Sequence, residues 1–268
     1  MPGMTIGSLF RNVLNLTACA LAIAAPLAVR ADSQYVFSGR APLGLGDRLD
    51  VTNINGPVSV VQTSGGEAHV RAKVSAQRGD ARTVRIQITR VGSTVYVCPV
   101  YPGTPVGRDC TQHGSNSNND DVRVEFAIEM PKGVSLHAGT VNGTIDARGL
   151  DAYIDAGSVN GSITLSTSAR AQAKTVNGSI DAGIGARRWI GSLSFGAVNG
   201  SVAVRLPRNA AFTLNAGTLT GSIHITGFPL AEAQSSGPVG HSARGTVGSG
   251  GGTLAIKTLN GALRLDAR

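Results

Sequence analysis

Aromatic residues are scarce in this chain of 268 residues: Phe, Trp and Tyr make up 4% of it, whereas glycine occurs 36 times. A core with few large rings has to be built from Val, Ile, Leu and Ala side chains that pack closely. Many of these side chains are β-branched, which favours a thin, strand-rich architecture. No segment shows a convincing pattern for a helix longer than one or two turns. The sequence therefore predicts an all-β fold.

Acidic residues are outnumbered by basic ones, 16 to 24, which gives a formal net charge of +8. The basic residues are spread singly along the chain, and the one adjacent pair, Arg187-Arg188, lacks the aromatic-spaced basic neighbours of a nucleic-acid groove. We therefore expect no nucleic-acid partner. Trp189 follows the pair. These three residues either grip an anionic surface ligand or let the Trp ring pack against the flank of the fold, and packing is the commoner arrangement.

The first 31 residues have the features of an export signal. Arg11 supplies a positive charge, residues 13–27 are mostly apolar, and small residues around Ala31 suit cleavage. A lipoprotein signal ending at Cys19 is the less favoured alternative, because most of the apolar run follows that residue. The run is too short and too interrupted for a retained transmembrane anchor. We expect residues 1–31 to be removed and the mature chain to be periplasmic, extracellular or at the cell surface.

Cysteine is almost absent, and only Cys98 and Cys110 remain after removal of the signal. An even pair around a Pro- and Gly-rich segment of an exported protein predicts a disulfide, in a loop that spans residues 98–120. A metal site is a weak alternative, because only His113 lies nearby and a second cysteine pair is lacking. We expect no metal and no other cofactor.

What the chain has in abundance is one repeated phrase, which begins as TVNGTI at Thr140 and returns as SVNGSI, TVNGSI and AVNGSV. Aligned on the glycine, seven twelve-residue units begin at Leu49, Leu136, Ile154, Ala171, Leu193, Leu214 and Leu254. The steps between the units from Leu136 to Leu214 are 18, 17, 22 and 21 residues, and the last step, 40 residues to Leu254, corresponds to about two rungs. Periods near 20 indicate a solenoid or another array. The repeated turn residues are Asn55, Gly56, Asn142, Gly143, Asn160, Gly161, Asn177, Gly178, Asn199, Gly200, Gly221, Asn260 and Gly261.

Asn-Gly between β-branched residues is also a strong signal for a hairpin with a type I′ turn. In such a hairpin Val141 would face Thr144, so each face would mix polar and apolar side chains. In a β-solenoid, equivalent positions of successive rungs stack instead, with Val141 over Val159 over Val176. We favour this stacking, and we place the Val, Gly and Ile of each unit on one dry face, with a bend between positions 3 and 6.

Architectural roles account for the repeated pair. Glycine at position 8 lets the backbone bend or approach its neighbour closely. Asparagine at position 7 can bond to the asparagine of the next rung, as in the amide ladders of stacked sheets. The predicted organisation is a longer-stranded region at 32–130 that carries the disulfide loop, followed by a β-solenoid at 131–268 with rungs of 17–22 residues. A Gly/Ser-rich insertion at 229–252 is expected to be mobile.

The repeat units resemble a bacterial putative-adhesin family, a domain of unknown function with β-strand repeats. The resemblance rests on the VNGSI-type units, on the phrase IEMPKGVSLHAGTVNG and on LDVTNINGPVSV, and it covers nearly all of residues 45–265. It implies a β-helical solenoid and an adhesin-like role, and it brings no catalytic residues. The chain departs from the family in the disulfide loop and in the insertion at 229–252.

Enzymes are a separate possibility, because β-helices also host glycan-active enzymes whose sites need converging carboxylates. Position 11 of the units carries no two carboxylates on adjacent rungs, so we expect no enzyme. We predict an exported adhesin-like surface or scaffold protein of the cell envelope, which binds a glycan, an anionic surface or a protein through many weak contacts. The alternatives are a periplasmic envelope-stress or assembly accessory that binds another protein, and a β-helix glycan-active enzyme.

Overall fold

The computed structural model describes residues 33–103, 110, 121–230, 234–236 and 240–268. The predicted export signal and most of the 98–120 loop lie outside the described residues. Residues 32–268 form one compact unit. Strands make up most of the described residues, and the single helical element among them is a short 3₁₀ turn at Ala81–Thr83. The all-β prediction is confirmed.

Two mixed sheets contain these strands. Sheet A has the spatial order β1 (Ser33–Pro42), β4 (Glu67–Ala76), β7 (Val122–Pro131), β3 (Val58–Thr63), β9 (Ile145–Leu150), β11 (Ile163–Thr167), β13 (Ile180–Ile184), β15 (Val202–Leu206), β21 (Leu263–Ala267) and β17 (Ile223–Thr226). Sheet B has the order β18 (Gln234–Ser236), β19 (His241–Val247), β16 (Phe212–Thr220), β20 (Thr253–Asn260), β14 (Ser192–Asn199), β12 (Ala171–Asn177), β10 (Ile154–Asn160), β8 (Ser135–Asn142), β2 (Arg48–Thr52), β6 (Thr94–Val100) and β5 (Arg85–Val91).

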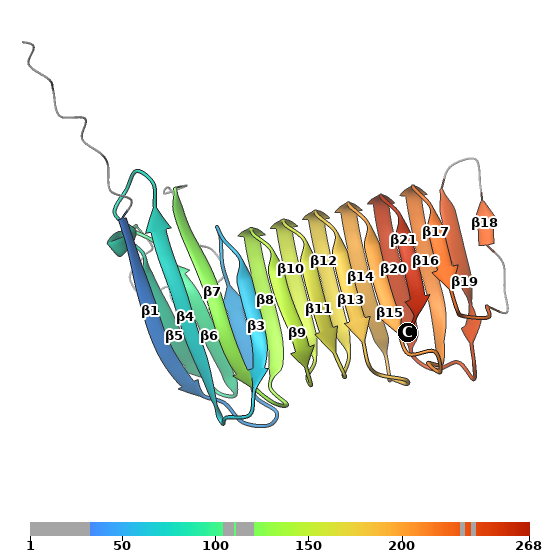
Figure 1. Ribbon diagram of the computed structural model, residues 1–268, viewed down its shortest axis with the longest axis horizontal. Coiled ribbons are helices and arrows are strands. Elements are labelled where there is room, and N and C mark those ends of the chain that lie inside the picture. Colours follow the sequence, from blue (N-terminus) through green and yellow to red (C-terminus); the bar gives the residue numbers. More distant parts are fainter. Residues whose placement is uncertain (1–32, 104–109, 111–120, 231–233, 237–239) are drawn as a thin grey trace, which may run out of the picture. The chain divides into compact units, whose positions relative to one another are not determined.

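Each repeat contributes one strand to sheet B and the next to sheet A (Figure 1). Neighbouring repeats pair in parallel at equivalent positions: Ile154 lies beside Leu136 and Ala171, and Ile163 lies beside Ile145 and Ile180. The Asn-Gly pair therefore forms a corner between the two sheets, and the hairpin alternative is wrong. The unit at Leu49 also belongs to this array, because β2 and β3 pair in parallel with β8 and β9.

The predicted dry face needs a correction. Thr140, Ser158 and Thr175 are buried in the core, whereas Val141, Val159 and Val176 are 40–42% exposed. The buried hydroxyls are satisfied, because each donates to the carbonyl oxygen of a corner glycine on the adjacent repeat, at 2.9–3.2 Å. Each sheet B strand thus alternates regularly up to its asparagine. The chain changes direction at Asn-Gly and not between positions 3 and 6.

Two features make the Asn-Gly corners stack. The asparagine side chains form a ladder in which each Nδ2 donates to the Oδ1 of the neighbouring repeat at 2.8–2.9 Å; it joins Asn55, Asn142, Asn160, Asn177, Asn199 and Asn260. The glycines touch backbone: a Cβ on Gly143, Gly161 or Gly200 would overlap the carbonyl oxygen of the glycine before it in the stack. The repeated pair is therefore required where one backbone rests on the next.

The order of the last repeats in space differs from their order in sequence. The strands β20 and β21, red in Figure 1, lie between β14 and β15 on one side and β16 and β17 on the other. Asn260 accordingly donates to Asn199, and Thr220 donates to Asn260 at the end of the ladder. The sequence interpretation, which placed this unit about two rungs beyond Thr220, is wrong.

The Gly/Ser-rich segment at 229–252 is more ordered than predicted. It contains β19, which pairs antiparallel with β16 from Phe212↔Val247 to Thr218↔His241. Ala243 and Val247 are buried by this pairing. Residues 231–233 and 237–239 of the segment lie outside the described residues. In the longer-stranded region before the repeats, the predicted disulfide joins Cys98 on β6 to Cys110.

Candidate functional site

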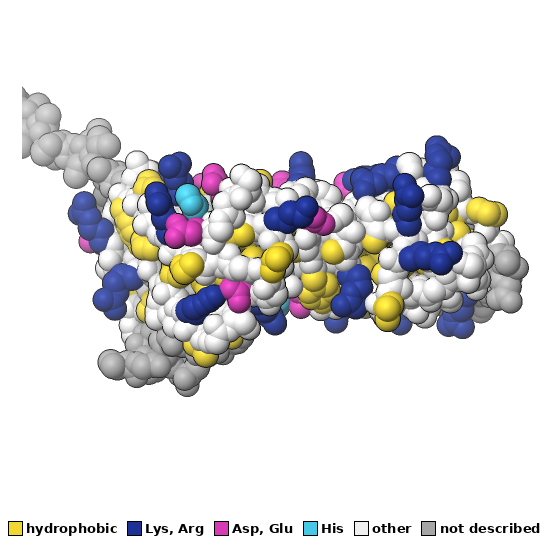
Figure 2. All heavy atoms as spheres, turned by 90° about the horizontal axis from the view of Figure 1, so that it is seen from below, with side chains coloured by type: hydrophobic (Ala, Val, Ile, Leu, Met, Phe, Trp, Pro, Cys, Tyr) yellow, Lys and Arg dark blue, Asp and Glu magenta, His cyan; other side chains and the backbone are white. Residues whose placement is uncertain are grey.

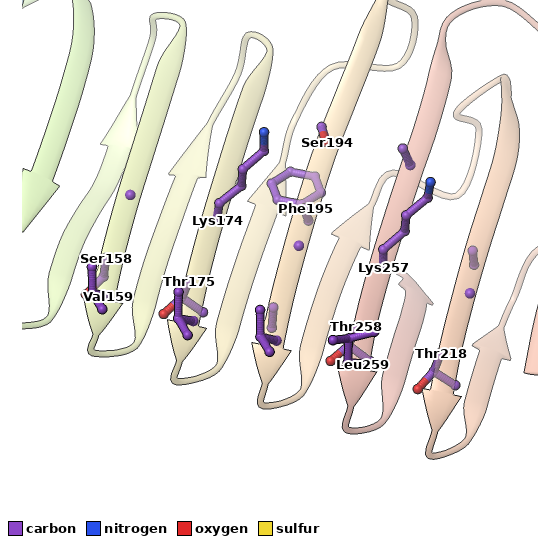
Figure 3. A pocket seen from close by; sticks show the side chains of 18 of the residues that line it. Ser158, Val159, Lys174, Thr175, Ser194, Phe195, Thr218, Lys257, Thr258 and Leu259 are labelled. Atoms are coloured by element: carbon purple, nitrogen blue, oxygen red, sulfur yellow. The ribbon is translucent and has the colours of Figure 1, made fainter. Parts of the chain in front are cut away.

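An open groove of about 1310 Å³ runs over the outer face of sheet B, from β2 to β19. Outward positions 4 and 6 of the repeats line it, together with position 2 of some repeats, so equivalent residues of successive strands lie side by side along its length. Figure 3 shows Lys174 and Lys257 extending from their strands, with Val159 and Leu259 near the strand ends. The lining residues that are described include no Asp and no Glu.

The floor of the groove is made of glycine. Gly139, Gly157, Gly196 and Gly217, here called the glycine floor, occupy position 4 of four strands. A Cβ would meet nothing within 4 Å at Gly139 or Gly157, and only a distant carbonyl oxygen at the other two. None of the four has a positive φ. Glycine weakens a strand relative to alanine. Packing does not explain the glycine floor, in contrast to the corner glycines, and this makes it a candidate part of a binding site.

One wall of the groove is apolar. It consists of the outward residues just before the corners, here called the apolar ridge: Val141, Val159, Val176, Val198, Leu259 and Leu219. Five of the six are 40–48% exposed. Contiguous exposed apolar side chains of this kind mark interaction sites on soluble proteins. The ridge was assigned to the core from the sequence, and its exposure is what makes the groove a candidate site.

Three basic side chains stand over the groove. Lys174 and Lys257 share position 4, where the register of the strands is Lys174, Gly196, Lys257, Gly217. Arg244 on β19 lies opposite Asn215, one position further along the strand face. All three residues are exposed. Their charges are available to a ligand, because none of them takes part in an ion pair among the described residues and no acid lines the groove.

At the β8 end of the groove, His137 lies between two acids on neighbouring strands, Asp50 and Asp155. Its Nδ1 is 3.3 Å from the Asp155 carboxylate. This carboxylate is the main cause that raises the pKa of His137, and its effect outweighs that of partial burial. The pKa of Asp155 is lowered, chiefly by His137. The charged pair therefore stabilises the fold between the two ordinary pKa values.

The pair predicts a pH-dependent loss of stability in His137→Gln. A raised histidine pKa gives stabilisation that is complete below its ordinary value of 6.5 and disappears as the pH rises through the folded-state pKa. We expect His137→Gln to lower the free energy of unfolding by about 1 kcal/mol near pH 5.5, where this stabilisation is complete, and by much less near pH 9. The loss at pH 5.5 is small because the pair is partly exposed. Urea titrations at both pH values measure this difference. His224→Gln on sheet A is the control, and equal losses at both pH values would contradict the prediction.

The structure places the remaining predicted site residues as follows. Arg187 and Arg188 are exposed, but Trp189 is 7% exposed, stacks on Phe212 and donates its indole N–H to the Thr253 carbonyl. The ring thus packs in the core, and a surface grip through Trp189 is wrong. The described residues contain no group of acids, histidines or cysteines that could hold a metal ion. They also contain no helix with the length and hydropathy to cross a bilayer.

Sequence reasoning missed the glycine floor, although a signal for it was present. Position 4 of the seven aligned units holds only Thr, Gly or Lys, while its neighbours at positions 3 and 5 are apolar or β-branched with few exceptions. Glycine repeated at one outward strand position indicates a place where a ligand or another backbone approaches closely.

The solved structures to which this chain is similar include the following two. One is a putative cell adhesion protein from Clostridium sporogenes ATCC 15579, with a TM-score of 0.47 and 11% identity over 87% of this chain and 100% of that chain. The other is a putative adhesin from Bacteroides fragilis NCTC 9343, with a TM-score of 0.29 and 12% identity over 87% of this chain and 97% of that chain. No protein-family model and no curated protein matches the sequence. These values are too low to transfer a ligand or an activity.

Proposed function

We propose that the protein is an exported, non-catalytic, adhesin-like component of the bacterial cell envelope, that its repeats form a β-solenoid, and that its ligand lies in the groove on sheet B. The observation that carries the proposal is the glycine floor beside the exposed apolar ridge. Glycine lowers the stability of a strand, and exposed apolar side chains lower the solubility of a protein. Neither feature serves the packing of the chain. The Cys98–Cys110 disulfide supports export, since such bonds persist in oxidising compartments.

The groove suits an elongated ligand better than a compact one. Each strand offers the same set of outward positions to a ligand, so a long ligand meets many equivalent weak contacts at once. Such contacts add up to high avidity without a deep pocket. A glycan-active enzyme would need two carboxylates that converge on its substrate. The described lining includes no Asp or Glu, and the two acids at the β8 end of the groove, Asp50 and Asp155, flank His137.

A second candidate function is the binding of a partner protein at the end of sheet A. There β17 has a neighbour, β21, on one side only among the described strands. Its inward residues Ile223 and Ile225 are only partly buried. A strand added at this edge would pair with the free backbone of β17 and cover both isoleucines, as in β-augmentation.

The test is binding of the purified protein to bacterial envelope fractions, comparing wild type with Gly157→Gln/Gly196→Gln. A Cβ would meet nothing within 4 Å at Gly157 and only the Lys257 carbonyl oxygen, at 3.9 Å, at Gly196. Glutamine side chains at these positions should therefore fill the groove without disturbing the backbone, and we expect binding to fall at least tenfold with unchanged folding. The control is Thr164→Gln/Ala203→Gln on the outer face of sheet A, which should bind as wild type does. If the floor variant bound envelope fractions as tightly as wild type does, the function would have to be assigned to another surface, such as the edge of β17.

A further inference from the structure

We infer that the groove binds a linear acidic glycan with one anionic group per disaccharide. This inference rests on the proposed function and adds the chemical class of the ligand. It follows from the order of the strands in sheet B, which could not be read from the sequence because β20 lies between β14 and β16.

The cations of the groove recur on every second strand. In the order β12, β14, β20, β16, β19, the first, third and fifth strands carry Lys174, Lys257 and Arg244. The strands between them present Gly196 and Gly217 at the same level. Because neighbouring strands lie about 4.8 Å apart, Lys174 and Lys257, which share one level of the sheet, are about 10 Å apart across the strands. Arg244 continues the alternation on β19, but it is offset by two residues along its strand. A ligand that crosses the strands therefore meets a positive charge, an opening and a positive charge in turn.

A polysaccharide chain matches this pattern. One pyranose residue is about as long as the spacing between strands, so each sugar would rest on one strand and each disaccharide would span one cation repeat. The C–H faces of the rings would contact the apolar ridge, and Ser194, Asn215 and Ser242 at the outward positions can bond to hydroxyls. The glycine floor leaves room for the rings to approach the backbone.

The charge distribution favours an anion at this end of the groove. Between residues 32 and 181 the chain has 14 basic and 14 acidic residues, whereas residues 182–268 have 8 basic and 2 acidic ones. On the face drawn in Figure 2, Lys and Arg gather over the C-terminal repeats, and the visible Asp and Glu side chains lie mostly over the other repeats. Such an asymmetry steers an anionic chain toward β20, β16 and β19.

An acidic peptide fits the groove less well. An extended peptide advances about 3.3 Å per residue and points successive side chains to opposite sides. An acid at every third residue would therefore face the cations and the solvent alternately. A glycan with alternating neutral and acidic sugars has no such mismatch.

The test uses hyaluronan oligosaccharides, which are linear and carry one carboxylate per disaccharide, in calorimetric titrations of the full-length protein at low salt. The neutral probe is the same oligosaccharide with its carboxyl groups reduced to alcohols, and poly-glutamate is the peptide probe. We expect hyaluronan to bind at least tenfold more tightly than either, with an affinity that falls as salt is added.

Lys174→Gln/Lys257→Gln should weaken hyaluronan binding at least tenfold. Arg71→Gln/Lys73→Gln on β4 removes the same charge from another face and should have little effect. A spacing variant, Gly196→Lys/Lys257→Gly, keeps the net charge but places the second lysine on β14, next to Lys174 on β12. This variant should lose affinity as well. Thermal melting confirms that each variant is folded.

Poly-glutamate that binds as tightly as hyaluronan, or a spacing variant with full affinity, would overturn the inference, since charge alone would then explain binding. If hyaluronan fails to bind while envelope fractions still bind through the glycine floor, the inference falls and the proposed function stands. If neither binds, both fall.

Discussion

Replacing Gly161 by alanine is expected to lower the free energy of unfolding by about 3 kcal/mol. The new Cβ would overlap the carbonyl oxygen of Gly143, which is fixed in the stack of corners. This carbonyl also accepts the hydroxyl of Ser158. Relief would require the backbones of two repeats to separate, and it would strain the amide ladder between Asn142 and Asn160. Chemical denaturation followed by circular dichroism measures the loss.

Gly157→Ala in the same repeat is the matched control, with the opposite expectation. Its Cβ would meet nothing, so alanine should raise the free energy of unfolding by about 0.5–1 kcal/mol, through the lower conformational entropy of the unfolded chain. Equal effects of the two substitutions would contradict the distinction between corner and floor glycines, on which the candidate site depends.

Leu263→Ala is the second substitution with a large expected effect, about 3 kcal/mol, because it leaves a cavity in the core. Leu263 is 1% exposed and lies between Val202 on β15 and Ile223 on β17. Hydrogen exchange should therefore accelerate in β16 and β17, which precede it in the chain, as well as in β15. The repeat of β8 and β9 should keep its protection, since repeat arrays transmit effects mainly to neighbours.

Leu259→Ala is the control for this prediction. Leu259 lies on the apolar ridge and is 48% exposed, so its truncation should change the free energy of unfolding by less than about 0.5 kcal/mol. If Leu263→Ala accelerated exchange in β21 alone, the insertion of β20 and β21 between earlier repeats would be contradicted.

Local features of the fold could be predicted from the sequence. The spacing of the glycines predicted the stacked repeats, and the asparagines predicted the ladder, because both depend on identical residues that meet in register. The disulfide followed from its two cysteines. Polarity alone could not predict that the Thr side chains point into the core and the Val side chains point outward. The hydroxyls of buried Thr140 and Thr175 donate hydrogen bonds to glycine carbonyl oxygens of the adjacent repeat, which offsets the cost of burying them.

The place of the last repeat depends on long-range pairing, for which the sequence holds only a weak signal. The unit at Leu214 has Thr220 where the others have asparagine. Threonine can donate one hydrogen bond to Asn260, which suits the end of the ladder. The groove depends on the same order, because Lys174 and Lys257 come two strands apart only after β20 has entered beside β14.

The entry of β20 and β21 between earlier repeats also has a consequence for the order of folding. Repeats up to β15 can dock one by one as the chain lengthens. The next strands, β16 and β17, then lack their neighbours β20 and β21, which follow them in the chain. Phe212 and Leu214, which are buried in the finished protein, would not reach their final packing until these later strands are present. A chaperone would find a natural target in that interval.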